Sequence, residues 1–407
     1  MARPLSWSTI DEKILIAGGI LILAVTGAVL TRRSRFPLLV TFLGIGMLLG
    51  SDGIGGIYFD DVQLARSIGI VGLIAILFEG GLTTSWREVR PVIAPAAMLS
   101  TVGVVVTAVV TAAAAHQLLS LSWSKSLLLG AVVGSTDAAA VFATLRFTRL
   151  RRRLATLLAV ESGANDPMAV ALTLGLIAWV EHSDYGVGNF VVLLARQFAL
   201  GLVVGIVLGL VASRLLQRLP TDLAPFASVA SIGTAALAYG VAASLHGSGF
   251  LAVYLVALWV GNTPMPLRRT IVTFHEGLAF LAQVVLFIVL GLLVFPGRLG
   301  DVAWSGLALT AVLLFVARPL AVVASLTPFG YRVREQLFLS WAGLRGAVPI
   351  VLATFALSAN VQGSGTIFNA VFFVVLVSTL AQGMTLEPFA RRLGLATEVQ
   401  PYDRRAK

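Results

Sequence analysis

The sequence contains no cysteine, and only four of its 407 residues are histidine. Without cysteine the chain can form neither a disulfide framework nor a thiolate metal site. The histidines stand far apart, at positions 116, 182, 246 and 275, so no spacing typical of a zinc site is present. These two shortages exclude the common cysteine-based sites and leave oxygen-bearing side chains as the main source of chemistry.

Charged residues are scarce as well, at 12% of the chain against 58% hydrophobic residues. One aqueous core could not hide so large an apolar surface, which indicates a protein of the lipid bilayer. The net charge of +10 could suggest a nucleic-acid partner. However, the basic residues form short clusters between apolar runs and build no basic face interleaved with aromatics, so we expect no nucleic-acid binding.

Thirteen apolar runs are candidates to cross about 30 Å of hydrocarbon. They predict an all-α polytopic membrane protein. The runs span residues 14–30, 36–50, 63–82, 92–119, 125–145, 154–180, 187–212, 224–245, 247–262, 271–295, 302–326, 335–358 and 367–390.

The distribution of lysine and arginine tests this assignment, because cytoplasmic loops carry the excess of positive charge. With thirteen crossings, 21 of the 29 basic residues fall on one side, which we therefore assign as cytoplasmic. The N-terminus is then outside and the C-terminus inside. The strongest basic cluster near the N-terminus follows the first run, unlike that of a signal peptide, so we interpret this run as a true span. The six basic residues assigned to the outside are Arg3, Lys13, Arg66, Lys125, Arg196 and Arg298.

Two of the runs contain polar interruptions and stand seven apart in the count. The fifth carries Ser135-Thr136-Asp137 and the twelfth carries Arg345-Gly346-Ala347-Val348-Pro349. An odd offset inverts the orientation of equivalent spans, and carriers built from inverted repeats place broken helices together at mid-membrane. We therefore predict two inverted six-helix repeats whose broken helices cross in the middle of the bilayer.

The sixth run holds a polar cluster made of Glu161, Ser162, Asn165 and Asp166. At about 100° per residue these side chains spread over roughly 140° of one helical face. Asp166 lies about 18 Å from the start of the run at 1.5 Å per residue, close to the midplane. Pro167 follows it and removes one amide donor from the helix. A carboxylate at this depth with no basic neighbour in its own span indicates a transport site.

The fifth run supplies a second carboxylate. Asp137 follows Gly134-Ser135-Thr136, small and hydroxyl-bearing residues that tolerate an unwound backbone. If the helix breaks there, Asp137 would neutralise the positive ends of half-helices, and Thr136 could offer its hydroxyl or carbonyl oxygen to a cation. The alternative for Thr136 and Ser162 is a structural one, since membrane helices use such hydroxyls to hold each other.

Two buried arginines need partners. We predict that Arg345 forms a structural ion pair with Glu161, because either charge alone would be costly at that depth. Arg318 lies nearer the inner end of the eleventh run and could extend its side chain to the interface. Gln283, in the tenth run, is a candidate for lining a polar path. We interpret Glu79 as interfacial.

The motifs around these residues resemble signature segments of the monovalent cation/proton antiporters. The segments are Gly134 to Asp137, Glu161 to Pro167 and Gly343 to Pro349, and the context from Glu161 to Ala169 is similar to the bacterial potassium/proton antiporter branch that includes cell volume regulation protein A. The similarity covers essentially all thirteen runs. Ala138 stands where many relatives have proline, and the cytoplasmic regulatory domain usual in that branch is absent from this sequence.

The resemblance implies roles for the same residues. Asp166 would be the shared ligand of proton and cation, with Asn165 beside it, Thr136 and Ser162 as cation contacts, and Asp137 as the charge at the crossover. It also implies a homodimer in the bacterial inner membrane. The transmembrane domain at 1–393 would consist of a dimer scaffold at about 1–82 and 187–300 and a transport core at about 92–182 and 302–393, followed by a short tail at 394–407.

These observations predict a secondary antiporter, not an enzyme, that exchanges K⁺ or Na⁺ for H⁺ with no cofactor. Proton and cation would compete for Asp166. Asn165 precedes that carboxylate in place of a second aspartate, so exchange is expected to be one for one and electroneutral. The sequence leaves the choice between K⁺ and Na⁺ open. The alternatives are a coupled symporter or a channel on a similar scaffold and, from His275-Glu276 alone, a membrane hydrolase.

Overall fold

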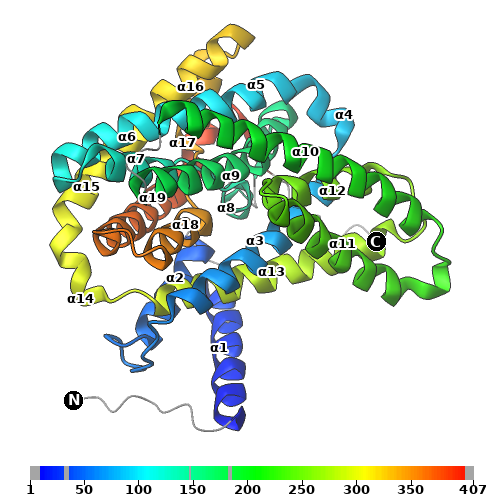
Figure 1. Ribbon diagram of the computed structural model, residues 1–407, viewed down its shortest axis with the longest axis horizontal. Helices are drawn as coiled ribbons and strands as arrows, with labels where there is room; N and C mark the ends of the chain where they lie inside the picture. Colours follow the sequence, from blue (N-terminus) through cyan, green and yellow to red (C-terminus); the bar gives the residue numbers. More distant parts are fainter. Residues whose placement is uncertain (1–9, 32–35, 146–147, 182–185, 399–407) are drawn as a thin grey trace.

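The computed structural model describes residues 10–31, 36–145, 148–181 and 186–398, and within them the chain is almost entirely helical (Figure 1). The predicted all-α class is confirmed, and one small antiparallel sheet is added to it: β1 (Thr148–Leu150) pairs with β2 (Ala396–Glu398). The α-helices are α1 (Ile10–Thr31), α2 (Leu38–Leu49), α3 (Val62–Thr83), α4 (Trp86–Val89), α5 (Ile93–Met98), α6 (Val104–Leu119), α7 (Trp123–Val132), α8 (Ala138–Thr144), α9 (Arg152–Glu181), α10 (Val187–Gln217), α11 (Ala224–Ser244), α12 (Gly249–Asn262), α13 (Arg268–Leu292), α14 (Pro296–Leu299), α15 (Ala303–Val312), α16 (Arg318–Leu326), α17 (Val333–Trp341), α18 (Ala347–Ser358) and α19 (Ser364–Arg392).

Helix is the form in which an apolar segment satisfies its backbone groups without water, and this accounts for the architecture. Nine helical segments of the described chain are long and apolar enough to cross a bilayer. The apolar helices α2, α12 and α18 are shorter, and the run predicted at 125–145 is divided between α7 and α8. Each predicted run contains helix, but the number of thirteen crossings stays a prediction.

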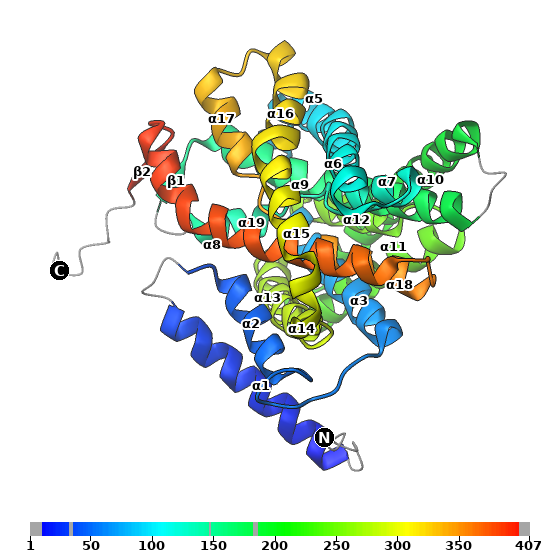
Figure 2. The ribbon, with the colours of Figure 1, turned by 90° about the vertical axis from the view of Figure 1, so that its left-hand side faces the viewer.

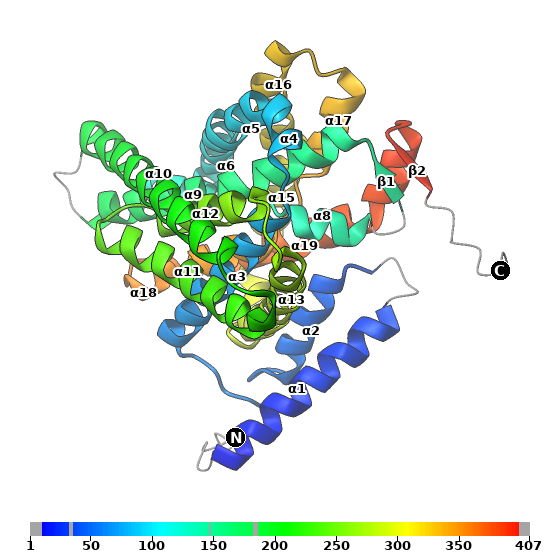
Figure 3. The same cartoon turned by 90° about the vertical axis from the view of Figure 1, so that its right-hand side faces the viewer.

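The helices pack in two groups. One contains α2, α3 and α10 to α13, and the other contains α5 to α9 and α15 to α19. The groups meet where α3 packs on α18 and where α9 packs on α10 and α12. Helix α1 lies at the edge of the molecule against α2, on the side opposite α16 and α17 (Figures 2 and 3). The polar helix α9, which carries the predicted transport residues, is therefore placed at the junction of the groups.

Within the first group, the backbones of α2 and α13 lie in close contact. A Cβ atom on Gly46 of α2 would lie 2.3 Å from the carbonyl oxygen of Ile288 in α13. Only glycine permits this separation, which is typical of membrane helices that associate through small residues.

Four contacts join connecting segments in pairs. The backbone amide of Trp86 donates to Asn262 at 2.6 Å, and β1 pairs with β2. Asp52 accepts from the amide of Gly297 at 3.0 Å, and Lys125 donates to Gln362 at 3.3 Å. Every one of these contacts joins loops that the basic-residue pattern assigns to the same side. Residues 32–35, 146 and 404–407, which contribute to that pattern, lie outside the described part of the chain.

Candidate functional site

The centre of the molecule is a crossing of two unwound segments. Helix α7 ends at Val132 and α8 begins at Ala138, while α17 ends at Trp341 and α18 begins at Ala347. The two breaks touch, because the amide of Asp137 donates to the carbonyl oxygen of Leu344 at 2.8 Å. The predicted broken helices that meet inside the protein are therefore confirmed.

Arg345 neutralises this crossing and does not pair with Glu161. Its Nη1 atom donates to the carbonyl oxygen of Gly134 at 2.9 Å and also to that of Ser135. These carbonyls follow the end of α7 and have lost their helical partners, so they form the negative pole of a half-helix that a cation stabilises. The predicted Glu161–Arg345 ion pair is wrong: the freed carbonyls hold this guanidinium.

Glu161 is instead paired with Arg318. Nη1 of Arg318 donates to Oε1 of Glu161 at 2.6 Å, and Nη2 donates to Oε2 at 3.0 Å. The Arg318 side chain is 3% exposed and that of Glu161 is 0% exposed. Arg318 is thus buried, and the extension to the interface that its position allowed is not observed. It begins α16 directly after the π-turn at Leu313–Ala317, within a helical segment that runs from Pro296 to Phe329 and exceeds the predicted run at both ends. A buried pair of this bidentate kind is structural, since each charge has the other as its main partner.

Three polar side chains attach α9 to the crossing. Ser162 donates to the carbonyl oxygen of Thr136 at 2.9 Å and accepts from the amide of Ala138 at 3.1 Å. Asn165 donates to the hydroxyl oxygen of Thr136 at 2.6 Å, and that hydroxyl donates to Glu161 at 3.4 Å. Thr136 and Ser162 are therefore engaged in the network that holds the crossing, which is the structural alternative considered for these two hydroxyls from the sequence, and Asn165 joins the same network.

Asp137 has two functions at the crossing. Its carboxylate accepts from the amide of Ala140 at 3.1 Å and so caps the first turn of α8. It also lies against Gly346, the residue before α18, where a Cβ atom would stand 1.9 Å from Asp137 Oδ2. The negative charge thus faces the starts of both half-helices, as predicted.

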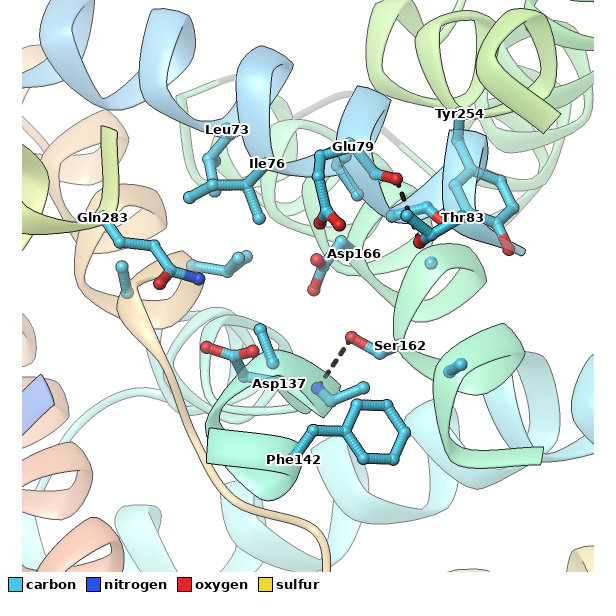
Figure 4. Close-up of a pocket in the computed structure, with 18 of the residues that line it drawn as sticks. Leu73, Ile76, Glu79, Thr83, Asp137, Phe142, Ser162, Asp166, Tyr254 and Gln283 are labelled. Atoms are coloured by element: carbon cyan, nitrogen blue, oxygen red, sulfur yellow. Dashed lines mark hydrogen bonds between the residues drawn. The ribbon is translucent and has the colours of Figure 1, made fainter. Parts of the chain in front are cut away.

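Asp166 stands at the centre of the 30-residue helix α9 and borders a cavity of about 350 Å³. The residue is 7% exposed, and its Oδ1 atom is buried with no hydrogen-bond partner in the described chain. Figure 4 shows Asp166, Asp137 and Ser162 around the same space, with Gln283 on its wall. Of the predicted ligands, Asp166, Asp137, Ser162 and Gln283 line the cavity, whereas Thr136 and Asn165 lie behind its wall.

The cavity contains a carboxylate that the sequence interpretation placed at the interface. Glu79 of α3 lines it together with Thr83, Thr84 and Tyr254 (Figure 4). The sequence did contain an indication that Glu79 faces a neighbouring helix. Four residues of α3 follow it, and the first two of them are a glycine pair that narrows the helix. Its orientation toward α9 could not be read from one segment alone.

The charges around the cavity are of one sign. Glu79, Asp137 and Asp166 line it, and among the described residues no lysine, arginine or histidine does. No group of three or more His, Cys, Asp or Glu in the described chain is arranged to hold a metal ion together. Pro167 leaves the carbonyl of Gly163 without its helical donor, and Gly163 also lines the cavity. The arrangement suits a proton or a single monovalent cation held by oxygen atoms.

Comparison with known proteins places this geometry among transport proteins. The family described as sodium/hydrogen exchanger, transmembrane, matches residues 20–392. A K(+)/H(+) antiporter NhaP from Alkalimonas amylolytica is 44% identical over 388 residues, which cover 95% of this chain and 67% of that protein. A K(+)/H(+) antiporter NhaP2 from Shewanella sp. strain ANA-3 is 40% identical and is covered to the same 67%.

The fold also matches a solved structure. The sodium proton antiporter MjNhaP1 from Methanocaldococcus jannaschii superposes with a TM-score of 0.82 over 94% of this chain and 99% of that one, at 23% identity. This likeness supports the overall architecture described above.

Proposed function

Because this chain belongs to the transmembrane sodium/hydrogen exchanger family, we propose that it exchanges monovalent cations for protons at Asp166. The chain is a multi-pass membrane transporter, and its relatives named for K⁺/H⁺ exchange are bacterial. We assign it to the bacterial plasma membrane with the N-terminus outside and the C-terminus in the cytoplasm, as the basic residues predict.

The observation that carries the proposal is the buried carboxylate of Asp166 beside a cavity with no cationic side chain among its described residues. A bare carboxylate in a low-dielectric interior is unstable, and no described residue pairs with it as a counter-charge. A proton or an alkali cation from the cavity supplies the missing charge. Since one charge is enough, binding of either excludes the other.

Exchange follows from this competition. Asp166 with a bound cation or a bound proton is neutral and can cross between the two sides, whereas the empty carboxylate would have to move with its charge unbalanced. The same restriction prevents net leak of either ion. With Asn165 neutral and engaged with Thr136, only one charge exchanges per cycle, so we infer electroneutral one-for-one transport.

The cavity gives the direction in which this conformation opens. It is bordered by Glu79, Thr83 and Thr84, which lie at the end of α3 assigned to the cytoplasmic side. We therefore interpret the conformation as inward-facing. Transport would proceed by displacement of the helix group containing α9 relative to the group containing α3, with the latter as the scaffold of a homodimer.

Proteoliposomes provide the test. Asp166→Asn is expected to abolish K⁺- or Na⁺-driven alkalinisation of an acid-loaded lumen while leaving the melting temperature close to wild type, since the amide retains the shape. Asp222→Asn, the same change at an exposed loop position, serves as the control and should transport normally. Cation-dependent proton exchange that survives in Asp166→Asn would refute the proposed site, and a rate that follows an imposed membrane potential would refute electroneutrality alone.

A further inference from the structure

A second cavity, of about 570 Å³, lies along the same helices as the first and further toward the other face. On α9 it is bordered by Val170 and Leu174, beyond Asp166, and on α12 by Phe250, before Tyr254. It therefore opens on the side that the basic-residue pattern assigns to the outside.

Two arginines line this cavity. Arg66 reaches it from α3 and Arg196 from α10, so two of the six basic residues assigned to the outside meet at one place. None of the described lining residues is acidic. Within the described ranges no carboxylate oxygen lies within 4.0 Å of either guanidinium. The cavity is thus positively charged where the first is negatively charged.

The two guanidiniums have hydrogen-bonding capacity to spare. Arg66 donates from Nη1 to Ser358 at 3.1 Å and lies 4.5 Å from the centre of the Phe355 ring, but its buried Nε atom has no acceptor in the described chain. Arg196 is exposed, nine residues after the start of α10, about 14 Å along the helix at 1.5 Å per residue. An arginine at that depth is stabilised by an anionic partner.

The remaining wall of the cavity is largely apolar. Val170, Leu174, Val192 and Phe250 contribute to it, and Val192 belongs to an exposed apolar face that continues along α10 through Val203 and Val207. An anion that fits here carries a negatively charged group for the arginines and hydrocarbon for α10. Acidic phospholipids have this composition, and arginine binds phosphate through charge-assisted hydrogen bonds that are often bidentate.

We propose that the second cavity binds the phosphate-bearing headgroup of an acidic phospholipid between Arg66 and Arg196, with the acyl chains lying along the exposed face of α10. The site is separate from Asp166 and does not depend on the antiport mechanism. Because Arg66 also contacts Ser358 and Phe355 on α18, the headgroup would bind at the junction of the two helix groups.

Native mass spectrometry of the purified, delipidated protein tests this without any transport measurement. Phosphatidylglycerol and phosphatidylethanolamine are added at equal concentration, and inorganic phosphate is added in a separate arm. The expected result is preferential retention of phosphatidylglycerol by the wild type, reduced about tenfold in Arg196→Gln, the factor expected for one charge-assisted hydrogen bond. Arg196→Lys, which keeps the charge, should retain most of the preference.

The matched control is Arg214→Gln, which removes an exposed arginine from the same helix outside the cavity. It should bind phosphatidylglycerol as the wild type does. Equal retention of the two lipids by the wild type, or an equal loss in Arg214→Gln and Arg196→Gln, would overturn the proposal. Binding of inorganic phosphate as tight as that of the lipid, and abolished by Arg196→Gln, would instead assign the cavity to a soluble anion and overturn the lipid occupant.

Discussion

At the scale of single residues, the interior holds charges with different tasks. Glu161 and Arg318 are buried and compensate each other through two hydrogen bonds, while Asp166 has no such partner in the described chain. Removing one member of a buried pair leaves the other as an uncompensated charge, which costs far more than removing both. Glu161 and Asp166, both on α9, are therefore expected to respond differently to substitution: loss of the first charge strands its partner, whereas loss of the second strands none.

Glu161 and Arg318 can be tested together. Arg318→Leu is expected to destabilise the protein by about 3–5 kcal/mol, because it leaves Glu161 buried without its counter-ion. The double variant Glu161→Met/Arg318→Leu should recover a large part of that loss. Thermal unfolding in detergent measures both, and a double variant that melts no higher than Arg318→Leu would show that the pair is not the source of the effect.

The competition at Asp166 makes a prediction about pH. Raising the pH removes the competing proton, so the apparent KM for the transported cation should fall as pH rises. Where Asp166 is mostly protonated the change approaches about tenfold per pH unit, and it vanishes once the carboxylate is ionised. Initial exchange rates in proteoliposomes at a series of equal internal and external pH values measure this. An apparent KM that stays constant over the whole range would contradict a shared site.

At the scale of elements, the crossing depends on how closely the two breaks approach. Gly346 leaves room for Asp137, which a side chain at that position would occupy. Since the clash involves a carboxylate held by the first turn of α8, the neighbour has little freedom to move.

Gly346→Ala is accordingly expected to abolish transport and to lower the melting temperature. Gly365→Ala, near the start of α19, adds the same methyl group where no atom lies within 4 Å and should leave both unchanged. Transport and thermal unfolding of the two variants, measured side by side, give the comparison. A fully active Gly346→Ala protein would mean that the crossing is looser than described.

The elements also show where sequence reasoning succeeds and where it stops. The breaks in α7–α8 and α17–α18 could be predicted, because Gly134-Ser135-Thr136 and Gly346 are local signals of an unwound backbone. The partner of Glu161 could not be predicted. Position along a helix gives approximate depth, but helix tilt and rotation decide which of two arginines faces the carboxylate, and neither can be read from one segment. Glu79 was missed for the same reason.

At the scale of the whole molecule, the pattern of basic residues assigns the loops to two sides. The contacts of Trp86 with Asn262 and of Lys125 with Gln362 each join two loops assigned to the same side, although neither contact involves an arginine. The contacts are thus consistent with the assignment.

The absence of cysteine makes the orientation directly measurable. Single cysteines at exposed Asp301 and Gln362 should react with a membrane-impermeant thiol reagent in intact cells, whereas those at exposed Asp222 and Arg334 should react only after permeabilisation. Mass shift after labelling gives the readout, and the cysteine-free parent is the blank. Labelling of the second pair first would invert the proposed topology.

The small sheet connects distant parts of the chain mechanically. Strand β2 follows the last helix, α19, and is bonded to β1, which follows α8 and precedes α9. Thr148 of β1 also donates to Glu387 of α19 at 3.0 Å. A force applied to the chain after Glu398 would therefore act on the sheet. Through β1 it would reach the start of α9, the helix that carries Asp166.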